Sequence, residues 1–223
     1  MKLQYLGDSK DSFKWDYHDY LTSSLGYKIL NVILMLTPDD KTNDGKTRPE
    51  RFSARLEIIN FCNGLNQKPR NIQKIKDLPS ATGEQYLVEL HKDGTIFTKN
   101  NRNEYFSNIS NPQKQQVIFI DPDNGFEPEK TNNNKHILYS DVATILEHIS
   151  QKSVISIFQH FRRISSKKDY ARIKERMPSG YTTAICWHSV MFVAVSKSKK
   201  TIENVIGLNH KYSKMRGINL LCL

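Results

Sequence analysis

The sequence predicts an α/β protein with three layers, in which helices cover both faces of a mostly parallel sheet. Short apolar runs of strand length alternate along the chain with segments whose apolar residues recur at helical spacing. Such alternation is typical of parallel strands joined by helical crossovers. Two further apolar runs, separated by only two residues, predict an antiparallel hairpin toward the C-terminus. The 223 residues suit one domain, and we expect residues 1–223 to form it.

The first half of the chain predicts a helix, a strand and a second helix. Apolar residues at helical spacing predict the first helix over Asp11–Leu25. A run of Ile, Val and Leu predicts a strand over Lys28–Leu36 that is buried on both faces. The spacing of apolar residues predicts another helix over Pro49–Cys62. Residues 70–112 give weaker signals, although Asn101–Ile109 fits a helix.

The second half gives clearer signals. Buried strands are predicted over Gln116–Ile120 and Val154–Phe158, because each is an apolar run of strand length. Ser140 is expected to cap a helix, and Ser165 or Ser166 to open a basic one. The expected helices extend to about Ile149 and Arg176, and the expected hairpin strands are Tyr181–Trp187 and Val190–Val195.

Positive charge is concentrated in the C-terminal third. The chain has 33 Lys and Arg against 23 Asp and Glu, and residues 151–223 hold 14 of the basic and 3 of the acidic side chains. Such asymmetry favours contact with a polyanion, so nucleic acid is the expected partner. The alternative is a basic surface that binds no partner. The candidate nucleic-acid contacts are Arg162, Arg163, Lys167, Lys168 and Arg172.

Several classes of protein find no support in the sequence. No apolar run reaches about 18 residues, so no membrane span is expected, and the polar N-terminus is unlike a secretory signal. Cys62, Cys186 and Cys222 are scattered without a CxxC pair, so we expect neither a zinc knuckle nor a disulfide framework. A reducing, cytoplasmic location is the expectation. The sequence also contains no GxGxxG, Walker loop or nucleophile elbow.

Polar residues follow three of the predicted strands at the point where each strand ends. Ligands of such sheets bind at the carboxyl ends of the strands, so we expect these side chains to line a common site. The alternative for the second cluster is a tight turn whose Asn-Gly pair supplies left-handed residues. His160 by itself could equally be a hydrogen-bonded structural histidine. The clusters are Pro38-Asp39-Asp40 with Asn43-Asp44-Gly45-Lys46, then Asp121-Pro122-Asp123-Asn124-Gly125, and finally Gln159-His160.

Asp121 and Asp123 also allow a metal site. Together with His160 they could bind a hard divalent cation such as Mg²⁺ or Mn²⁺. That site would make the protein a metal-dependent nuclease or phosphodiesterase, for example in phage defence. A further cluster, Gly7-Asp8-Ser9-Lys10-Asp11, precedes the first helix, and its alternative role is a helix cap with solvated charges.

These clusters, in this order, resemble a group of mostly uncharacterised bacterial proteins. More distantly they resemble the adenine-N6 methyltransferases that act on large-subunit ribosomal RNA, and the three-Cys-motif partner proteins. The order of elements is similar over the whole chain, which implies a Rossmann-like, methyltransferase-like sheet. The resemblance rests on Gly7-Asp8-x-x-Asp11-x-x-Lys14, the Asn43-Asp44-Gly45-Lys46 loop and Asp121-Pro122-Asp123-Asn124-Gly125.

The resemblance implies roles for individual residues. Asp121 and Pro122 would occupy the catalytic Asp-Pro positions, where the carboxylate accepts a hydrogen bond from the amine that is methylated. The sequence departs from the family where Asp123 replaces a second proline, and the loop after the first strand is acidic rather than glycine-rich. Gly125 stands near the position of a stacking aromatic, and Phe126 is the nearest substitute. The residues implied for the S-adenosylmethionine pocket are Gly7, Asp8, Asp11, Lys14, Asp44 and Gly45.

The sequence therefore predicts a nucleic-acid-modifying enzyme, in its simplest form an S-adenosylmethionine-dependent methyltransferase. Its catalytic candidates are Asp121, Pro122, Asp123 and His160. One alternative is the metal-dependent nuclease or phosphodiesterase. The other is a non-catalytic module that binds nucleic acid or a nucleotide on a degenerate methyltransferase-like fold. The residues specify neither DNA nor RNA, nor the target sequence, the metal or the oligomeric state.

Overall fold

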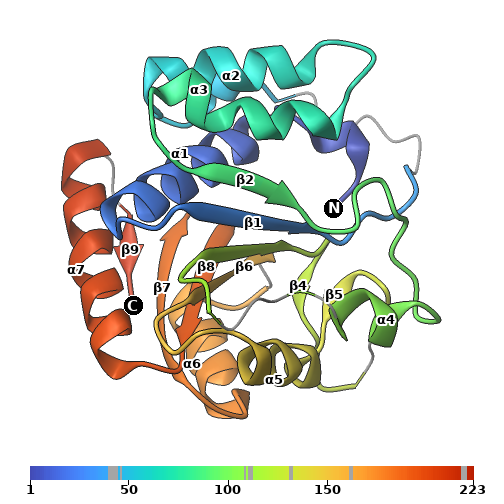
Figure 1. The fold of residues 1–223 in the computed structure, drawn as a ribbon, viewed down its shortest axis with the longest axis vertical. Coiled ribbons are helices and arrows are strands. Elements are labelled where there is room, and N and C mark those ends of the chain that lie inside the picture. Colours follow the sequence, from blue (N-terminus) through green and yellow to red (C-terminus); the bar gives the residue numbers. More distant parts are fainter. Residues whose placement is uncertain are drawn as a thin grey trace.

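The computed structural model describes residues 1–39, 45, 47–107, 109, 113–130, 133–160, 163–216 and 220–223. Within these residues the chain forms a seven-stranded sheet in the order β2-β1-β3-β6-β8-β7-β9. Helices cover both faces of this sheet. Figure 1 shows α1, α2 and α3 on one side and α5 and α6 on the other. The predicted α/β class with a mostly parallel sheet is confirmed.

Four neighbouring strands of the sheet are parallel. β1 (Ile29–Leu34) lies between β2 (Leu87–Leu90) and β3 (Val117–Asp121). β6 (Val154–His160) lies beyond β3 and is two residues longer than predicted. Because all residues of β1 and β3 are buried, their sequences are nearly continuous apolar runs rather than alternating ones, interrupted only by Asn31 in β1 and by Asp121 at the end of β3.

The remaining strands extend the sheet in antiparallel fashion. β7 (Tyr181–Trp187) and β8 (Val190–Ser196) form the predicted hairpin, and β8 also pairs antiparallel with β6. The hairpin does not end the chain. It is followed by α7 (Lys199–Arg216) and by the short strand β9 (Leu221–Cys222), which pairs antiparallel with β7.

The sheet has one hydrophobic core on each face, and a separate layer of helices covers each core. Alternate residues of a strand point to opposite faces, so Phe119 of β3 packs into the core beneath α1 and Ile120 into the core beneath α5. No helix of the described segments has the length and apolar composition to cross a membrane. The first core is covered by α1 (Ser9–Ser24), α2 (Leu56–Asn66), α3 (Leu78–Thr82) and α7, and the second by α4 (Arg102–Ser107), α5 (Tyr139–His148) and α6 (Ser166–Arg176).

Smaller elements connect these layers. A two-stranded sheet of β4 and β5 follows β3, and one short 3₁₀ segment precedes α1. Their bounds are Gly125–Phe126 and His136–Ile137 for the strands, and Leu3–Tyr5, Pro49–Arg51 and Ile72–Asp77 for the 3₁₀ segments.

The helix predicted over Pro49–Cys62 begins in fact only at Leu56. Phe52 has an extended backbone, with φ −95° and ψ 136°. Its buried ring packs 4.7 Å from the ring centroid of Phe13. The 3₁₀ turn Pro49–Arg51 and the buried Phe52 therefore resemble one turn of an α-helix in the sequence, although the α-helix starts only at Leu56.

The predicted cap of α5 is also wrong. Ser140 lies inside the first turn of this helix, which starts at Tyr139. Asp141 instead accepts a hydrogen bond of 2.8 Å from the Leu138 amide and so satisfies a donor at the start of the helix. The predicted start of α6 is confirmed, since Ser165 accepts a hydrogen bond from the Lys168 amide.

Candidate active site

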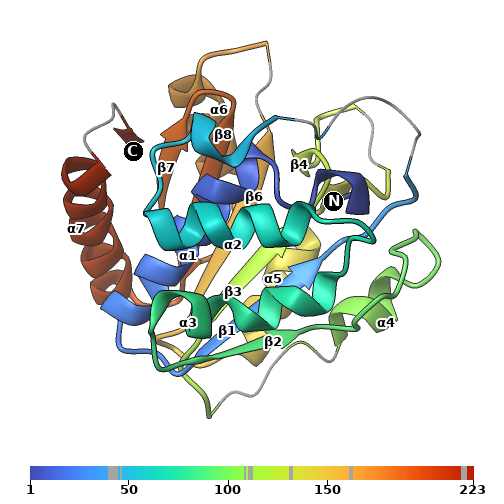
Figure 2. The ribbon, with the colours of Figure 1, turned by 90° about the horizontal axis from the view of Figure 1, so that it is seen from above.

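The carboxyl ends of β1, β3 and β6 meet at one edge of the sheet because these strands are parallel. The chain leaves β1 to form β2 on one side and then returns past β1 to form β3 on the other. The helices between them lie on opposite faces, since α2 and α3 follow β1 whereas α4 precedes β3. Ligands of open α/β sheets bind at such a reversal of strand order. Figure 2 shows the N-terminal segment at this edge, beside β4.

A pocket opens at this edge, with a volume of about 370 Å³ when the open solvent at its mouth is included. It joins three segments that are distant in the sequence: the start of α1, the turn after β3 and the end of β6. The structure thus brings the predicted catalytic residues together with the predicted N-terminal cluster. We call it the aspartate pocket, and its lining contains Asp8, Asp11, Asp121 and Asp123, with Met1, Tyr5, Lys10, Lys14, Pro122, Phe158 and His160.

Lys14 holds two of these carboxylates. Its Nζ lies 2.6 Å from Asp11 Oδ1 and 2.7 Å from Asp121 Oδ2, and all three side chains are buried. Burial alone would lower the pKa of Lys14, but the attraction of the Asp11 and Asp121 carboxylates raises it. Lys14 is therefore a permanent cation that fixes the Asp121 carboxylate at the end of β3.

The N-terminal cluster is at once a helix cap and a wall of the pocket. Asp8 Oδ1 accepts hydrogen bonds from the amides of Lys10 (2.8 Å) and Asp11 (3.1 Å), so Asp8 is the N-cap of α1. Burial and the nearby Asp11 carboxylate raise the pKa of Asp8 to about 6. Gly7 lies behind the pocket wall: its φ is 83°, and a Cβ there would collide with the carbonyl oxygen of Cys62.

The turn after β3 is a tight turn that needs a left-handed glycine, and it also contributes side chains to the pocket. These are the two roles that its sequence allowed. Gly125 has a φ of 98°, and a Cβ there would collide with the side chain of Gln159, so glycine is needed to close the turn. The residues before it line the pocket. Asp123 accepts a hydrogen bond of 2.8 Å from Thr37 Oγ1, and the Met1 amino group lies 3.3 Å from its Oδ1.

The aromatic side chains of the pocket differ from the one that the sequence suggested. Phe126 is 0% exposed and stacks on Tyr139, with ring centroids 5.2 Å apart. Tyr5 and Phe158 line the pocket instead. Phe158 could have been found from the sequence, because it lies two residues before His160 and hence on the same face of β6.

A shallower hollow continues the aspartate pocket toward solvent. Lys10 stands at the boundary, where its Nζ lies 3.0 Å from Nε2 of His160. Gly45 lines this hollow, whereas Asp44 lies outside the described residues. We call it the outer hollow; it spans about 980 Å³ with the open solvent at its mouth, and Lys2, Tyr5, Asp8, Lys10, Gly45, Thr47, Asp123, Asn124, Lys135 and His160 line it.

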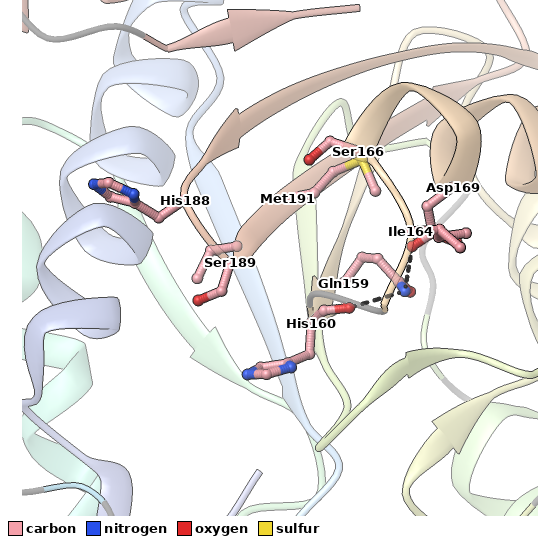
Figure 3. A pocket seen from close by; sticks show the side chains of 9 residues that line it. Gln159, His160, Ile164, Ser166, Asp169, His188, Ser189 and Met191 are labelled. Carbon is pink, nitrogen blue, oxygen red and sulfur yellow. Dashed lines mark hydrogen bonds between the residues drawn. The ribbon is translucent and has the colours of Figure 1, made fainter.

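A third pocket, of about 220 Å³, lies between β6, α6 and the hairpin turn (Figure 3). Figure 3 shows the Gln159 side chain turned toward Asp169, to which Nε2 donates a hydrogen bond of 2.9 Å. The ring of His160 points away from both. Gln159 Oε1 also accepts a hydrogen bond of 2.8 Å from the Phe126 amide. Gln159 therefore ties the turn after β3 to α6, which is a structural role.

The predicted nucleic-acid contacts do not form one group. Arg163, Lys167 and Lys168 are exposed near the start of α6, beyond the carboxyl end of β6. The Arg172 side chain is only 16% exposed, and its guanidinium donates hydrogen bonds of 3.0 and 2.9 Å to Asp169 Oδ1. Arg172 thus stabilises α6 internally and is poorly placed for a phosphate. Arg162 lies outside the described residues.

Comparisons with known proteins assign no family to this arrangement. No protein-family model matches the chain, and no curated protein is significantly similar to it. The function is therefore inferred from the geometry and charges of the site.

Proposed function

We propose that the protein is a nucleic-acid-modifying enzyme whose reaction takes place in the aspartate pocket, in its simplest form as an S-adenosylmethionine-dependent methyltransferase. The observation that carries this proposal is the convergence of Asp11, Lys14 and Asp121 at the carboxyl edge of the sheet, with ion pairs of 2.6 and 2.7 Å. A buried carboxylate held in one orientation is suited to position a reacting amine.

The arrangement of the sheet supports the same proposal. Four parallel strands are followed by β8, which runs antiparallel between β6 and β7. Parallel strands followed by an antiparallel hairpin, with only the short β9 beyond it, agree with the Rossmann-like, methyltransferase-like order that the sequence resemblance implies. The pocket lies where the strand order reverses, and this is the place where nucleotide-like ligands of such sheets bind.

The charge of the pocket suits a cationic methyl donor. Its lining holds four aspartates against Lys10, Lys14 and the Met1 amino group, so carboxylates outnumber the Lys and amino-group cations by one. A sulfonium cation would compensate this excess. Asp8 and Asp11 would supply negative charge beside the donor while they keep the hydrogen bonds that they already accept, and Gly45 would lie next to the donor in the outer hollow. When bound, S-adenosylmethionine supplies an activated methyl group.

The residues of the chain would orient the methyl acceptor. Lys14 binds Oδ2 of Asp121, and we assign Oδ1 to the hydrogen bond that the acceptor amine donates. The carbonyl of Pro122 would accept a second N–H of the amine, and the proline itself offers no competing amide donor. The proton that the amine loses is held at Asp121 Oδ1 and passed to water. Phe158 keeps water from the inner wall of the pocket.

The metal-dependent alternative is less favoured by the geometry. The Lys14 ammonium lies where Asp11 and Asp121 would otherwise share a metal ion, and Asp123 is bound by Thr37. Within the described segments, no group of three or more His, Cys, Asp or Glu side chains is arranged to hold a metal ion. A divalent cation between Asp11 and Asp121 would therefore have to displace Lys14.

Methyl transfer and donor binding test the proposal together. We expect calorimetry to show binding of S-adenosylmethionine that weakens in Asp11→Asn. Transfer of a labelled methyl group to a mixture of DNA and RNA should fall by about 10² to 10⁴ in Asp121→Asn. Asp141→Asn is the matched control, because Asp141 is a buried aspartate on α5 that pairs with Arg102 of α4 and does not line the pocket. This variant should retain methyl transfer.

Other outcomes would favour the alternatives. No donor binding at millimolar concentration would exclude the methyltransferase, and oligonucleotide binding without donor binding would favour a non-catalytic module. Cleavage of DNA or RNA with Mg²⁺ or Mn²⁺ that is lost in Asp121→Asn would favour the nuclease. Cleavage that persists in this variant would exclude Asp121 from a metal site.

A further inference from the structure

The outer hollow brings together basic side chains from segments that are far apart in the sequence. Lys10 comes from the first turn of α1, His160 from the end of β6, and Lys135 from the loop between β4 and β5. Lys2 also contributes to the lining. None of the predicted nucleic-acid contacts that the structure describes lies in this hollow. The concentration of positive charge here is therefore separate from the basic helix α6.

Each of the three segments is held in place by backbone or helix geometry. Lys10 is the second residue after the N-cap Asp8, and its amide donates to Asp8 Oδ1. The carbonyl of Lys135 accepts a hydrogen bond of 2.9 Å from the Asn124 amide, so the loop that carries Lys135 is tied to the turn after β3. His160 is hydrogen-bonded through its own amide to the Asn124 carbonyl at 3.3 Å. The basic side chains of the hollow thus surround the turn after β3, to which two of their segments are hydrogen-bonded.

The two acidic residues of the outer hollow, Asp8 and Asp123, accept hydrogen bonds from other groups of the protein. Asp8 caps α1 through the amides of Lys10 and Asp11. Asp123 accepts the hydroxyl of Thr37. Asp8 Oδ1 and both carboxylate oxygens of Asp123 therefore have partners inside the protein, and the Lys10 ammonium and the His160 ring lie 3.0 Å apart at the boundary of the hollow. A multivalent oxyanion placed there could receive charge-assisted hydrogen bonds from Lys10 and Lys135 together.

We propose that the outer hollow binds a phosphodiester group of a polynucleotide, with Lys10 and Lys135 as phosphate ligands and His160 and Asn124 at its sides. This inference rests on the proposed function, because it names the substrate group that anchors the target nucleotide beside the aspartate pocket. A polynucleotide fits better than a small anion, because the hollow is open to solvent at its mouth, so that the chain on either side of a bound phosphate can extend out of it. Tyr5 lines both spaces and offers a ring to the adjoining base.

The salt dependence of oligonucleotide binding tests the inference. The probe is a fluorescently labelled single-stranded 12-mer, as DNA and as RNA, with inorganic phosphate and a mononucleotide as competitors. Lys10→Gln and Lys135→Gln should each weaken binding about tenfold and reduce the slope of log K against log salt by about one. Lys199→Gln is the matched control, because this lysine is 71% exposed on α7, outside the hollow. Thermal unfolding of each variant confirms that it is folded.

The outcomes separate this inference from the proposed function. The inference is wrong if the wild-type protein does not bind the oligonucleotide. It is also wrong if Lys10→Gln and Lys135→Gln have the same slope of log K against log salt as the wild type. It is also wrong if only Lys167→Gln and Lys168→Gln lower the slope, since α6 would then be the phosphate surface. Binding of S-adenosylmethionine by Lys135→Gln is measured in parallel. If Lys135→Gln binds S-adenosylmethionine normally and its salt slope is unchanged, only the phosphate site is excluded. If the lysine variants have a reduced salt slope but the protein binds no S-adenosylmethionine, only the methyltransferase is excluded.

Discussion

Asp8 meets two demands that oppose each other. As the N-cap of α1 it accepts two backbone amides, but as a buried carboxylate it is costly to ionise. Burial and the Asp11 charge raise its pKa to about 6 in the folded protein, whereas an unfolded aspartate titrates near about 3.9. Between these values the folded chain binds a proton that the unfolded chain does not. The Asp8 contribution to stability therefore falls as the pH rises from about 4 to about 6.

We predict that Asp8→Asn removes this pH dependence. Asparagine caps a helix about as well as aspartate and has no charge to bury. The stability of the variant relative to wild type should therefore increase between pH 4 and pH 7, by up to about 3 kcal/mol. Urea unfolding at the two pH values measures the change. A difference in stability that is equal at both would show that Asp8 does not titrate in this window.

Single residues of the site could be predicted where a charged side chain stands next to a buried, apolar segment. Charged residues directly after a buried strand, such as Asp121, have no role in a core, and this conflict identified them. Their partners could not be predicted, because Lys10 and His160 are 150 positions apart. Lys135 was not singled out, because it follows an Asn-rich loop that resembles low-complexity sequence.

At the scale of elements, α1 is unusual because its polar side is buried as well as its apolar one. Asp16 and Asp19 are both 0% exposed. Arg55, just before α2, lies between them, with Nε 2.7 Å from Asp16 and a terminal nitrogen 2.5 Å from Asp19. Tyr212 of α7 donates a further hydrogen bond of 2.7 Å to Asp16. These bonds attach α1 to the helices that cover it.

Replacement of Arg55 should therefore destabilise the layer of helices that contains α1, α2 and α7. Arg55→Met leaves Asp19 without its cation and Asp16 with only Arg216, whose guanidinium lies 3.7 Å away. We expect this change to lower the free energy of unfolding by about 3 to 5 kcal/mol. Arg51→Met is the control, because Arg51 is exposed four positions earlier and should change stability by less than about 0.5 kcal/mol. Urea unfolding compares the two variants. Similar small losses in both would mean that Arg55 is not the connection between these helices.

The elements were predicted best where the signal was local. The apolar run of β1 and the spacing of Phe13, Tyr17 and Leu21 in α1 sufficed to place them. Solvated charges were one alternative for the start of α1, and Asp16 is buried instead because its partners come from just before α2 and from α7. Helix α7 was not predicted, although Ser198 accepts the Thr201 amide at its start and gives a recognisable cap.

At the scale of the whole molecule, the aspartate pocket exists only because the N-terminal helix packs on the centre of the sheet. The rule that parallel strands share a carboxyl edge predicted that Asp121 and His160 would meet. Neither this rule nor any local pattern predicted that Lys14 would pair with Asp121, 107 positions away. This ion pair is consequently the best probe of whether α1 and β3 form one cooperative unit.

A double-mutant cycle on Lys14 and Asp121 measures that coupling. Lys14→Met leaves Asp11 and Asp121 buried without a cation, and we expect a loss of about 3 to 5 kcal/mol in the free energy of unfolding. Asp121→Asn should cost less, because Lys14 keeps Asp11 at 2.6 Å. In the double variant only one buried carboxylate lacks its cation, so its loss should be smaller than the sum of the two by about 1 to 3 kcal/mol. Additive losses in urea unfolding would show that the two side chains do not interact, and the reaction centre would then lack the fixed carboxylate on which its chemistry depends.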